Sequence, residues 1–543
     1  MVPKNKLYCA DNLHILRDVK EIPDESVDLI YLDPPYQAQK HYNVIWEDAQ
    51  AQLLAFQELW HWTPGVQWNY ERLQTEYPKT GIYLRAQVEC MGTTGLTAYL
   101  VNMACRLVEC RRVLKSSGNL FIHHSPTFDA YMKVMCDQIF GFSNSKREVI
   151  WKRTSSHGGA KSFPIVHDRL LHYVKDAAKA KWFSQYQPYT TKYTAARFRK
   201  DPLTGELVDD CDLTGGGVVS GPCGQPWRGY DPSVVGEGRH FAIPGATALA
   251  YAERTGKSLR NIKPYPAKLD ALDAAGLIHW TSNGTPRAIK PLKNLRGKVV
   301  TSIWDDIPPV NSQAKCRTGP SITRKPVDLI SRILHCCTEP GDVYLDTFCG
   351  CGPGIEAAHA LGRQWIGIDI TASAIDAIEA HLVTRFGSAV KSEYALEIVP
   401  TTLVEARRLA RRNPFKFESW VVKVLGAKAY KQNQRGDGGV DGILVFHDES
   451  VQGERKSRRI VISVKSSKKP LINDVRALWE TRERMGADIC VFVSLNTFGK
   501  NSTIPSLAAS KGFYTDSKGV AHSRFQLLTA GEVVLGSGIS YPR

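Results

Sequence analysis

The segment from Glu339 to Ile370 constrains the fold of this chain more than any other stretch. An apolar run predicts a strand that ends at Asp346, followed by a helix and a second strand that ends at Asp369. The turn before the helix carries glycines: Gly350, Gly352 and Gly354. Glycine lets a backbone turn tightly and lie against a ligand, and an acid about 20 residues farther on is placed to bond ribose hydroxyls. The segment therefore predicts an α/β fold that binds a nucleoside-type cofactor, either a dinucleotide or S-adenosylmethionine.

A second motif, Asp33-Pro34-Pro35-Tyr36, directly follows the apolar run VDLIYL. Both prolines fix φ and lack an N–H, so the loop is rigid and its carbonyls are free to accept hydrogen bonds. A carboxylate and a carbonyl side by side can accept both hydrogens of one NH₂ group and leave the nitrogen lone pair directed outward. An aromatic ring beside them can stack on a flat base. These residues are candidates for methyl transfer to an exocyclic amine, although a strand-closing turn explains them equally well when they are taken alone.

Alternating strand and helix signals recur along most of the chain and favour a mostly parallel sheet covered by helices. One helix is predicted over residues 95–116 and another over 129–140. The alternation stops at about residue 155, and the mixture of Gly, Pro, aromatic and basic residues up to about 300 predicts a loop-rich region. Alternation resumes at 322–386, and residues 413–500 are predicted to form a separate α/β unit. The predicted segments are 1–154, 155–300, 301–400 and 401–543.

The balance of charges indicates a polyanionic partner. The 543 residues carry a net charge of +16, and lysine and arginine bind phosphates with release of counterions; a merely soluble basic protein would show the same balance. The 13 cysteines are scattered and odd in number, which favours reduced thiols over a disulfide scaffold. No run of about 18 apolar residues is present, and the first residues lack the apolar stretch of a signal peptide. We therefore expect a cytoplasmic protein without a membrane partner.

Six segments in one order resemble a known family. They are YCADNLHIL with SVDLIYLDPPY, RVLKSSGNLFIHHSP, WKRTSSHGG, PWRGYDP with GRHFAIP, WDDIPPVNSQAKCRTGPSITRKPVDLISRIL, and LDTFCGCGPGIEAAHALGRQWIGIDI. Over about residues 6–385 the chain resembles the amino-methylating DNA methyltransferases in their β arrangement, in which DPPY precedes the cofactor turn. The resemblance implies a Rossmann-like α/β domain that uses S-adenosylmethionine, with an inserted target-recognition region at 155–300.

The resemblance also assigns roles to single residues. Asp33 and the Pro34 carbonyl are implied to hold the target amine, and Tyr36 to stack on the base. The implied S-adenosylmethionine pocket comprises Asp11, Thr323, Lys325, Asp346, Phe348, Gly350, Gly352 and Asp369. One departure from the family lies in the turn, where Gly-Cys-Gly-Pro stands for the usual Gly-Ser-Gly-Thr. Pro353 lacks an N–H, so one backbone donor to the cofactor is lost.

Double-stranded DNA is the implied substrate, and its target base must leave the stack to reach such a pocket. The spelling DPPY favours adenine N6, and cytosine N4 stays open as the alternative. Candidate contacts to phosphates or base edges are Arg153, Arg197, Arg199, Arg228, Arg239 and Lys290 to Lys298. A homodimer is left open. The resemblance points to a bacterial or phage-encoded enzyme of a restriction-modification system.

Residues 413–500 resemble the Mrr-type restriction endonucleases through NPFKFESWVVKVLGAKAYKQNQRGDGGVDGILVF and RRIVISVKSS. That resemblance implies an acid on one strand and an acid-x-Lys on the next, which hold Mg²⁺ and assist the attacking water. Asp441 and Lys465 fit this pattern, but Ser463 stands where Glu or Gln is expected, and Glu418 is a candidate substitute. The domain is therefore either a nuclease, which would make the chain a combined restriction and modification enzyme, or a module that holds DNA without cutting it. A nuclease with a vestigial methyltransferase and a DNA-binding protein without catalysis are the remaining alternatives.

Overall fold

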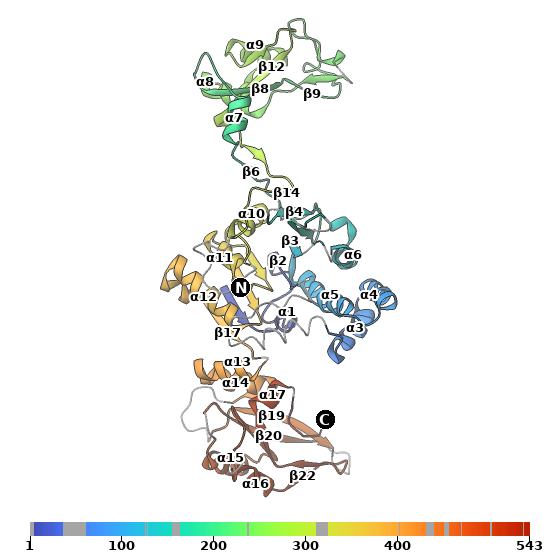
Figure 1. Cartoon of the computed structure of the whole chain (residues 1–543), viewed down its shortest axis with the longest axis vertical. Coiled ribbons are helices and arrows are strands. Elements are labelled where there is room, and N and C mark those ends of the chain that lie inside the picture. Colours follow the sequence, from blue (N-terminus) through green and yellow to red (C-terminus); the bar gives the residue numbers. More distant parts are fainter. Residues whose placement is uncertain are drawn as a thin grey trace. The chain divides into compact units, whose positions relative to one another are not determined.

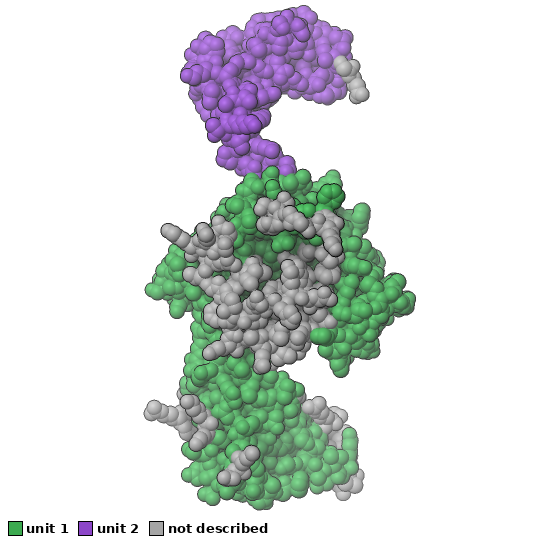
Figure 2. Space-filling model, viewed as in Figure 1, with its two compact units in different colours: residues 1–183, 302–543 green, residues 184–301 purple. Residues whose placement is uncertain are grey.

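The computed structural model describes residues 5–35, 61–124, 126, 129–154, 163–235, 238–310, 324–400, 402–430, 439–449, 455–467, 470–499, 502–535 and 537–542. The chain divides into two compact units, residues 1–183 with 302–543 and residues 184–301. Figure 2 colours the first unit green and the second purple. Within the described ranges, no helix has both the length and the apolar character needed to cross a membrane.

A nine-stranded sheet forms the centre of the first unit (Figure 1). Its order is β14 (Ile303–Trp304), β4 (Val149–Lys152), β5 (His167–Val174), β3 (Leu114–His124), β2 (Val27–Leu32), β15 (Val343–Asp346), β16 (Gln364–Asp369), β1 (Asn5–Cys9) and β17 (Tyr394–Ile398). Neighbouring strands pair in parallel except β5, which is antiparallel to both β3 and β4. The mostly parallel sheet predicted from the alternating pattern is confirmed.

The two strands that carry the predicted motifs are neighbours in this sheet. β2 pairs in parallel with β15, and Tyr31 is in register with Asp346. All residues of β2 are buried, as expected for a strand of a parallel sheet covered on both faces. Because β2 and β15 run in the same direction, the loops that follow Leu32 and Asp346 leave the sheet at the same edge, where ligands bind in such folds. The topology thus brings the DPPY segment and the glycine turn together, although they are far apart in the sequence.

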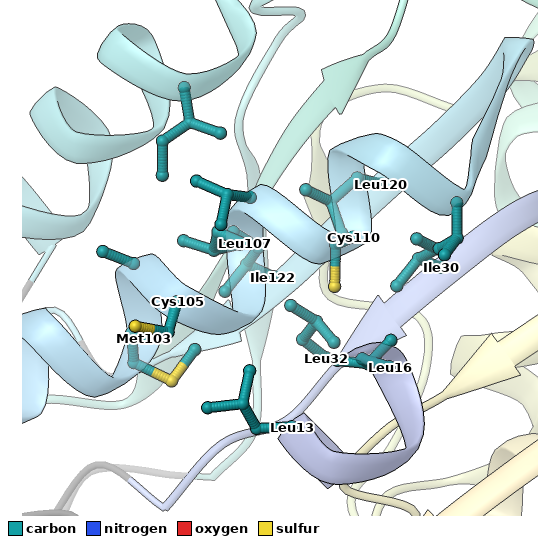
Figure 3. Close-up of a cluster of buried hydrophobic side chains, with 14 of the residues drawn as sticks. Leu13, Leu16, Ile30, Leu32, Met103, Cys105, Leu107, Cys110, Leu120 and Ile122 are labelled. Carbon is teal, nitrogen blue, oxygen red and sulfur yellow. The ribbon is translucent and has the colours of Figure 1, made fainter. Parts of the chain in front are cut away.

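Helices flank the sheet. The helices α1 (Asn12–Arg17), α3 (Pro64–Glu76), α4 (Pro78–Met91), α5 (Gly95–Val113) and α6 (Asp129–Phe140) share one hydrophobic core with the sheet. Figure 3 shows part of that core, in which Leu107 of α5 is drawn beside Ile122 and Cys110 beside Leu120. α5 is buried on nearly all sides, which is typical of an apolar helix in the middle of a core. α10 (Val327–Cys337), α11 (Pro353–Ala360) and α12 (Ala372–Phe386) form a second group, drawn on the other side of the strands in Figure 1.

One predicted helix was too long. The helix predicted over 95–116 ends at Val113, and the next residues begin β3. The chain extends here because Gly118 lies against Leu114, so closely that a Cβ on Gly118 would come within 2.6 Å of the Leu114 side chain. The pairing of β3 with β2 shifts register at this point, as a β-bulge does. The helix predicted over 129–140 is confirmed as α6.

The second unit, residues 184–301, has a hydrophobic core of its own that includes Trp227, Phe241, Leu269 and Leu272. Its strands are β6 (Tyr186–Gln187), β7 (Arg199–Lys200), β8 (Leu207–Asp212), β9 (Thr214–Gly216), β10 (Arg239–Phe241), β11 (Ile278–Trp280), β12 (Pro286–Pro291) and β13 (Lys298–Val299). The order β11-β12-β8-β7 makes a four-stranded antiparallel sheet, and β10 pairs with β9 and β13 with β6. The helices are α7 (Thr191–Arg197), α8 (Gly245–Thr255) and α9 (Tyr265–Ala274).

The loop-rich region predicted between 155 and 300 was therefore wrong in much of its length. β5 belongs to the nine-stranded sheet, and the second unit contains three antiparallel sheets, three helices and a core with buried aromatic residues. The frequent Gly and Pro residues obscured this, because short antiparallel strands alternate with the turns that such residues form. The domain boundaries given above stay predictions.

The C-terminal part of the first unit contains a second α/β sheet, as the sequence predicts. Its order is β18 (Lys428–Ala429), β19 (Gly442–Glu449), β20 (Arg455–Lys465), β21 (Ile489–Ser494) and β24 (Phe525–Thr529). β20, β21 and β24 are parallel, and β19 is antiparallel to β20. The helices of this part are α13 (Leu403–Arg412), α14 (Pro414–Val424), α15 (Ile472–Arg484), α16 (Ile504–Ala509) and α17 (Ala530–Val534), and β22 (Phe513–Thr515) pairs with β23 (Ala521–Ser523).

Candidate active site

Asp33 leaves the end of β2 and is held by Lys325. The Lys325 Nζ lies 2.9 Å from Asp33 Oδ1 and 2.8 Å from Asp33 Oδ2. Lys325 is 7% exposed and directly precedes Pro326, the N-cap residue of α10. Since a buried ammonium is stable only with a charged partner, the pair fixes the Asp33 carboxylate at the edge of the sheet. The sequence predicted Lys325 at the margin of the cofactor pocket, and that role stays a prediction.

Only part of the predicted catalytic motif is described. Pro34 is buried and Pro35 is half-buried, so this loop packs against the fold as its two rigid residues favour. Tyr36, predicted to stack on the base, and Thr323, predicted for the cofactor pocket, lie outside the described residues.

A buried polar network lies on β3, next to β2. The fully buried His123 places Nδ1 2.8 Å from the Tyr31 hydroxyl and Nε2 3.0 Å from Asp168 Oδ2. The Arg153 Nε lies 2.9 Å from Asp168 Oδ1. Burial lowers the pKa of His123 and the charge of Lys325 adds to this effect, although Asp168 opposes it. Burial alone would raise the pKa of Asp168, but the bond from His123 and the charges of Lys325 and Arg153 lower it overall. A neutral imidazole near pH 7 thus bridges β2 and β5.

The turn after β15 has a conformation that glycine adopts readily. The φ angles are +50° at Gly350 and +76° at Gly352, in the left-handed region. A Cβ on Gly354 would come within 2.0 Å of the Tyr344 hydroxyl, so the start of α11 lies directly on β15. Gly352 caps α11 and Pro353 takes its first position, where a backbone N–H has no partner inside a helix. Proline at position 353, where the family usually has threonine, therefore removes no hydrogen bond of the helix.

Asp346 ends β15 as a buried carboxyl group. Its Oδ2 accepts a hydrogen bond from the Tyr344 hydroxyl at 3.0 Å, and its Oδ1 accepts one from the Phe348 N–H at 3.2 Å. Burial raises the pKa of Asp346 to about 7; the two hydrogen bonds oppose this shift, and the charges of Asp33 and Asp369 add to it. A positive group in the adjoining pocket would favour the carboxylate.

Asp369 joins the end of β16 to the same turn. Its Oδ2 accepts a hydrogen bond from the Gly350 N–H at 2.9 Å, and its Oδ1 accepts from the N–H and the hydroxyl of Thr371 at 2.9 and 2.8 Å. Burial raises the pKa of Asp369, against the effect of these bonds. A carboxylate has about four lone-pair sites, so the internal bonds leave capacity for the predicted ribose contact.

The residues around this turn fit a cofactor that combines a nucleoside with a positive charge. Thr347 is 1% exposed, and its hydroxyl has no hydrogen-bond partner among the described residues, which is costly for a buried polar group without a ligand. No described atom lies within 4 Å of the place that a Cβ on Gly350 would take, so the backbone there is open to a ligand. The sulfonium of S-adenosylmethionine supplies the positive charge that Asp346 and Asp369 favour. The open backbone at Gly350 and the two buried acids therefore fit such a cofactor.

Asp11 follows β1 and caps α1. Its Oδ1 accepts hydrogen bonds from two backbone N–H groups of α1 at 2.7 and 3.3 Å, as N-cap residues do, and its Oδ2 lies 3.4 Å from the Arg106 Nη2. Asp11 thus has a structural role as the cap of α1, and its contact with the cofactor stays a prediction. Asn12, which sequence reasoning missed, donates from Nδ2 to the Thr347 carbonyl at 2.6 Å and accepts from the Arg106 Nε at 2.6 Å. It ties α1 to the cofactor turn.

A second unpredicted cluster connects the entry of α10 with α11 and α12. The Arg324 guanidinium lies 2.5 Å from Glu356 Oε2 and 2.7 Å from His381 Nδ1. Glu356 also accepts from Arg385 at 2.5 Å, and His381 Nδ1 lies 3.1 Å from the Cys351 carbonyl. The segment around Arg324 and Lys325 thus holds the glycine turn on one side and Asp33 on the other. Single charged residues in separate helices give no sequence signal for such a cluster.

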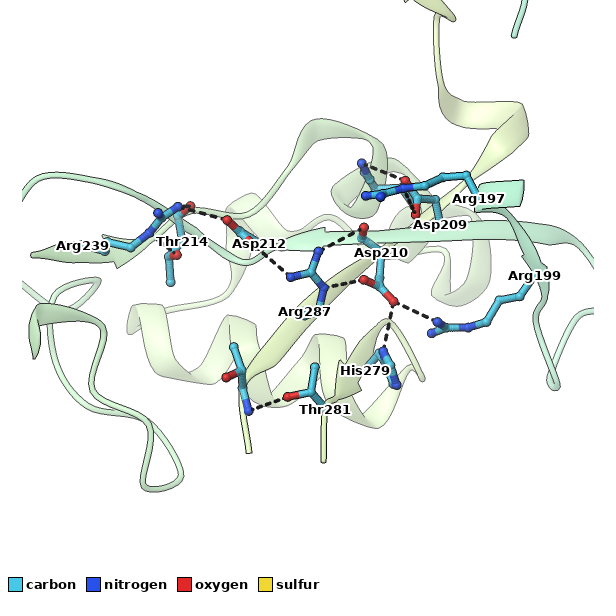
Figure 4. Close-up of polar contacts among 12 residues, drawn as sticks. Arg197, Arg199, Asp209, Asp210, Asp212, Thr214, Arg239, His279, Thr281 and Arg287 are labelled. Carbon is cyan, nitrogen blue, oxygen red and sulfur yellow. Dashed lines mark hydrogen bonds and ion pairs between the residues drawn. The ribbon is translucent and has the colours of Figure 1, made fainter. Parts of the chain in front are cut away.

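The arginines predicted to contact DNA are paired with carboxylates inside the chain. Arg153 pairs with Asp168, Arg197 with Asp209, Arg199 with Asp210, Arg228 with Asp270 and Asp273, and Arg239 with Asp212. Figure 4 shows Arg197, Arg199 and Arg239 directed at the acids of β8. Contact of these arginines with DNA stays a prediction. To bind a phosphate, each arginine would have to contact it in addition to its carboxylate or break the ion pair.

The predicted nuclease residues lie only partly together. A cavity of about 550 Å³ is lined by Gly439, Ser463, Lys465, Asp474, Ala477, Glu480, Thr481 and Arg484. Asp441 does not line it, and its Oδ2 accepts from the Val464 N–H at 2.6 Å. Glu418, half-buried on α14, does not line it either. The described part of the chain has no group of three or more His, Cys, Asp or Glu that could hold a metal. Among the described residues, the carboxylates predicted for Mg²⁺ are thus not gathered at this cavity, and Mg²⁺ in this domain stays a prediction.

The glycine turn, the acid that ends the next strand and the DPPY segment on the neighbouring strand together define a Rossmann-like S-adenosylmethionine-dependent methyltransferase fold. The family model described as DNA methylase matches residues 27–380, more than half of the chain. The chain belongs to the DNA methylase family. A second model, described as restriction endonuclease, matches residues 409–511, in agreement with the predicted C-terminal domain.

The chain is similar to several individual proteins. The type II methyltransferase M.EcaI of Enterobacter cloacae is 29% identical over 275 residues, which cover 50% of this chain and 54% of M.EcaI. The DNA adenine methyltransferase YhdJ of Escherichia coli K12 is 21% identical over 365 residues, which cover 66% of this chain and 77% of YhdJ. The solved structure of the PvuII DNA methyltransferase, described as cytosine-N4-specific, aligns over 73% of this chain and 96% of its own, with 12% identity and a TM-score of 0.32. The chain spans about half the length of M.EcaI and of two further curated relatives.

Proposed function

We propose that this chain methylates N6 of adenine in double-stranded DNA with S-adenosylmethionine as the methyl donor. The observation that carries the proposal is the position of Asp33, which follows β2 beside the end of β15 and is fixed there by Lys325. The cofactor turn begins at that same edge of the sheet. When bound, S-adenosylmethionine supplies an electrophilic methyl group.

The chain's own residues prepare the amine that accepts this group. The Asp33 carboxylate and the Pro34 carbonyl accept the two N–H bonds of the exocyclic amine, which leaves its lone pair directed away from them. Pro34 and Pro35 have no N–H, so no backbone donor of theirs competes with the amine for the carboxylate. Lys325 keeps Asp33 at this edge through both carboxylate oxygens. Preorganised acceptors of this kind favour the transition state because they need not move during the reaction.

The cofactor is held by the groups around the glycine turn. Asp369 accepts from the ribose hydroxyls, and the buried Thr347 hydroxyl, which has no partner among the described residues, takes a polar group of the ligand. Asp346 lies where a sulfonium would lower its pKa and favour the carboxylate. Phe348 contributes apolar surface at the edge of the core.

Adenine is the preferred target because the chain carries the DPPY spelling and has the adenine methyltransferase YhdJ among its relatives. Cytosine N4 is the second candidate, since its exocyclic amine presents the same two N–H bonds to Asp33 and Pro34. The C-terminal domain is proposed to hold DNA without cutting it, since Ser463 stands where an acid is expected and Asp441 accepts a hydrogen bond from the Val464 N–H. The restriction-modification role, the cytoplasmic location and a homodimer stay predictions.

The test combines nucleoside analysis with a variant of Asp33. The full chain is incubated with S-adenosylmethionine and unmethylated duplex DNA, and the DNA is digested to nucleosides for mass spectrometry. N6-methyl-2′-deoxyadenosine is the expected product. N4-methyl-2′-deoxycytidine alone would refute the adenine assignment. If the chain binds the cofactor but forms neither product, the proposal is refuted. Asp33→Ala should lower methyl transfer at least about a hundredfold with nearly unchanged cofactor affinity. The control Asp305→Ala removes an exposed carboxyl and should leave both unchanged.

A further inference from the structure

The basic residues of the second unit differ in whether an acid of the same unit pairs with them, which the sequence does not reveal. In one set, every cation lies within 4.0 Å of a carboxylate of the same unit; its members are Arg197, Arg199, Arg228, Arg239, Arg254, Arg287, Lys290 and Lys293. These pairs tie β8 to its neighbours in the manner that Figure 4 shows for Asp210 with Arg199 and Arg287. The charge of this set is already balanced by acids of the same unit.

The other cations of the unit form no ion pair with a described carboxylate; Lys192, Lys200, Lys268, Arg296 and Lys298 are spread along the chain, whereas three lie together in one short stretch, residues 256–263, which we call the basic segment. Its cations are Lys257, Arg260 and Lys263; all are exposed, and the segment contains no acid. Among the carboxylates that the structure describes, none forms an ion pair with any of the three. Their charge is therefore available to an external anion.

The basic segment is anchored so that its cations point outward. Leu259 is 7% exposed and Ile262 packs on the same core, so the residues between and beside them face solvent. The 3-10 helix at Leu259–Asn261 begins with Ser258, whose hydroxyl accepts from the Arg260 N–H at 3.3 Å. The Thr255 hydroxyl accepts from the Lys257 N–H at 3.2 Å. The cations are thus carried on backbone that is already held in place, which reduces the entropy lost when they bind.

We infer that the basic segment is the surface through which the second unit binds DNA phosphates, and that the paired arginines are structural. Three cations at spacings of three residues, without an acid between them, suit the regularly spaced charges of a nucleic acid backbone. Such contacts position the duplex and carry no sequence information. The inference rests on the proposed function, because it takes duplex DNA as the substrate.

The experiment compares two variants that lose the same charge from the same unit. One carries Lys257→Gln, Arg260→Gln and Lys263→Gln, and the matched control carries Arg197→Gln, Arg199→Gln and Arg228→Gln. Binding of the full chain to a fluorescent, unmethylated duplex is measured by anisotropy at several salt concentrations. Three lost phosphate contacts should lower the salt slope by about 3 and the affinity by about a hundredfold at about 0.15 M salt. The control should lose less than about fivefold, since a surface ion pair contributes little and distant charges are screened.

The outcomes separate this inference from the proposed function. Equal losses in both variants would show that only net charge matters and would refute the inference, as would a basic-segment variant that binds like the wild type. Either result leaves the proposed function standing if the wild type methylates DNA. A wild type that binds S-adenosylmethionine but neither binds nor methylates DNA would refute both. Unchanged cofactor affinity and an unchanged protease digestion pattern of residues 184–301 are required to attribute a loss to the contacts rather than to unfolding.

Discussion

Replacing Asp346 with Asn removes the buried carboxyl at the end of β15 and keeps its shape. Burial raises the pKa of Asp346 to about 7, whereas an unfolded Asp has a pKa of about 3.9. Between these values the folded chain keeps a proton that the unfolded chain has lost, so the folded state loses stability as pH rises. The difference of about three pKa units corresponds to about 4 kcal/mol when the titration is complete. Asn cannot titrate, and its amide can still meet the Tyr344 hydroxyl and the Phe348 N–H.

The Asp346→Asn variant should therefore gain stability relative to the wild type as pH rises. Between about pH 4.5 and about pH 8 the gain should reach about 3 kcal/mol. Hydrogen exchange of the β15 and β16 amides, corrected for intrinsic rates and measured without cofactor, reports the stability of this sheet rather than that of the whole chain. The control Asp305→Asn removes an exposed carboxyl and should show no such trend. A difference between variant and wild type that is constant across this pH range would refute the assigned burial and charge repulsion.

Further predictions follow from the same site and from the C-terminal domain. Asp369→Ala should raise the dissociation constant of S-adenosylmethionine by about one to two orders of magnitude, because charge-assisted hydrogen bonds contribute roughly 1.5–3 kcal/mol. An unchanged dissociation constant in titration calorimetry would show that another residue contacts the ribose. Lys325→Met should lower kcat about tenfold or more, because Asp33 is then misplaced, and should leave cofactor affinity unchanged. Lys325→Arg should restore part of the lost kcat. Weaker cofactor binding by Lys325→Met would instead show that Lys325 contacts the cofactor. The full chain should bind plasmid DNA without nicking it in Mg²⁺ or Mn²⁺; nicking that disappears in Asp441→Ala and Lys465→Ala would make the chain a nuclease as well.

The sequence was sufficient for the fold and for the strands that carry the site, because both depend on local patterns. The apolar run before Asp33 and the glycines after Asp346 each specify a strand and its turn, and parallel pairing then places both turns at one edge. The bond between Lys325 and Asp33 was out of reach, since an isolated lysine gives no sign of its partner far along the chain. The network of His123 with Tyr31 and Asp168 could not be predicted for the same reason.

Charged residues of the second unit show a further limit of sequence reasoning. Arg228 and Arg239 were predicted as DNA contacts because they are basic and lie in the predicted target-recognition region. The structure shows Arg228 beside Asp270 and over the Trp227 ring, at 4.9 Å from its centre, and Arg239 bonded to Thr214 at 2.7 Å. Whether a cation is free depends on the register of strands that are distant in sequence, and composition does not encode that register.

The position of β1 in the sheet has a consequence for how the chain is made. β1 lies between β16 and β17 and pairs with both in parallel, so its second neighbour is complete only about 390 residues later. At roughly 5–20 residues per second, a ribosome needs about 20 to 80 seconds to reach β17. During that time β1 has both hydrogen-bonding edges open, and β2 lacks β15. The unit of residues 184–301, which is continuous in sequence and has its own core, can fold in this interval, whereas the strand that leads to Asp11 must stay unpaired and soluble on the nascent chain.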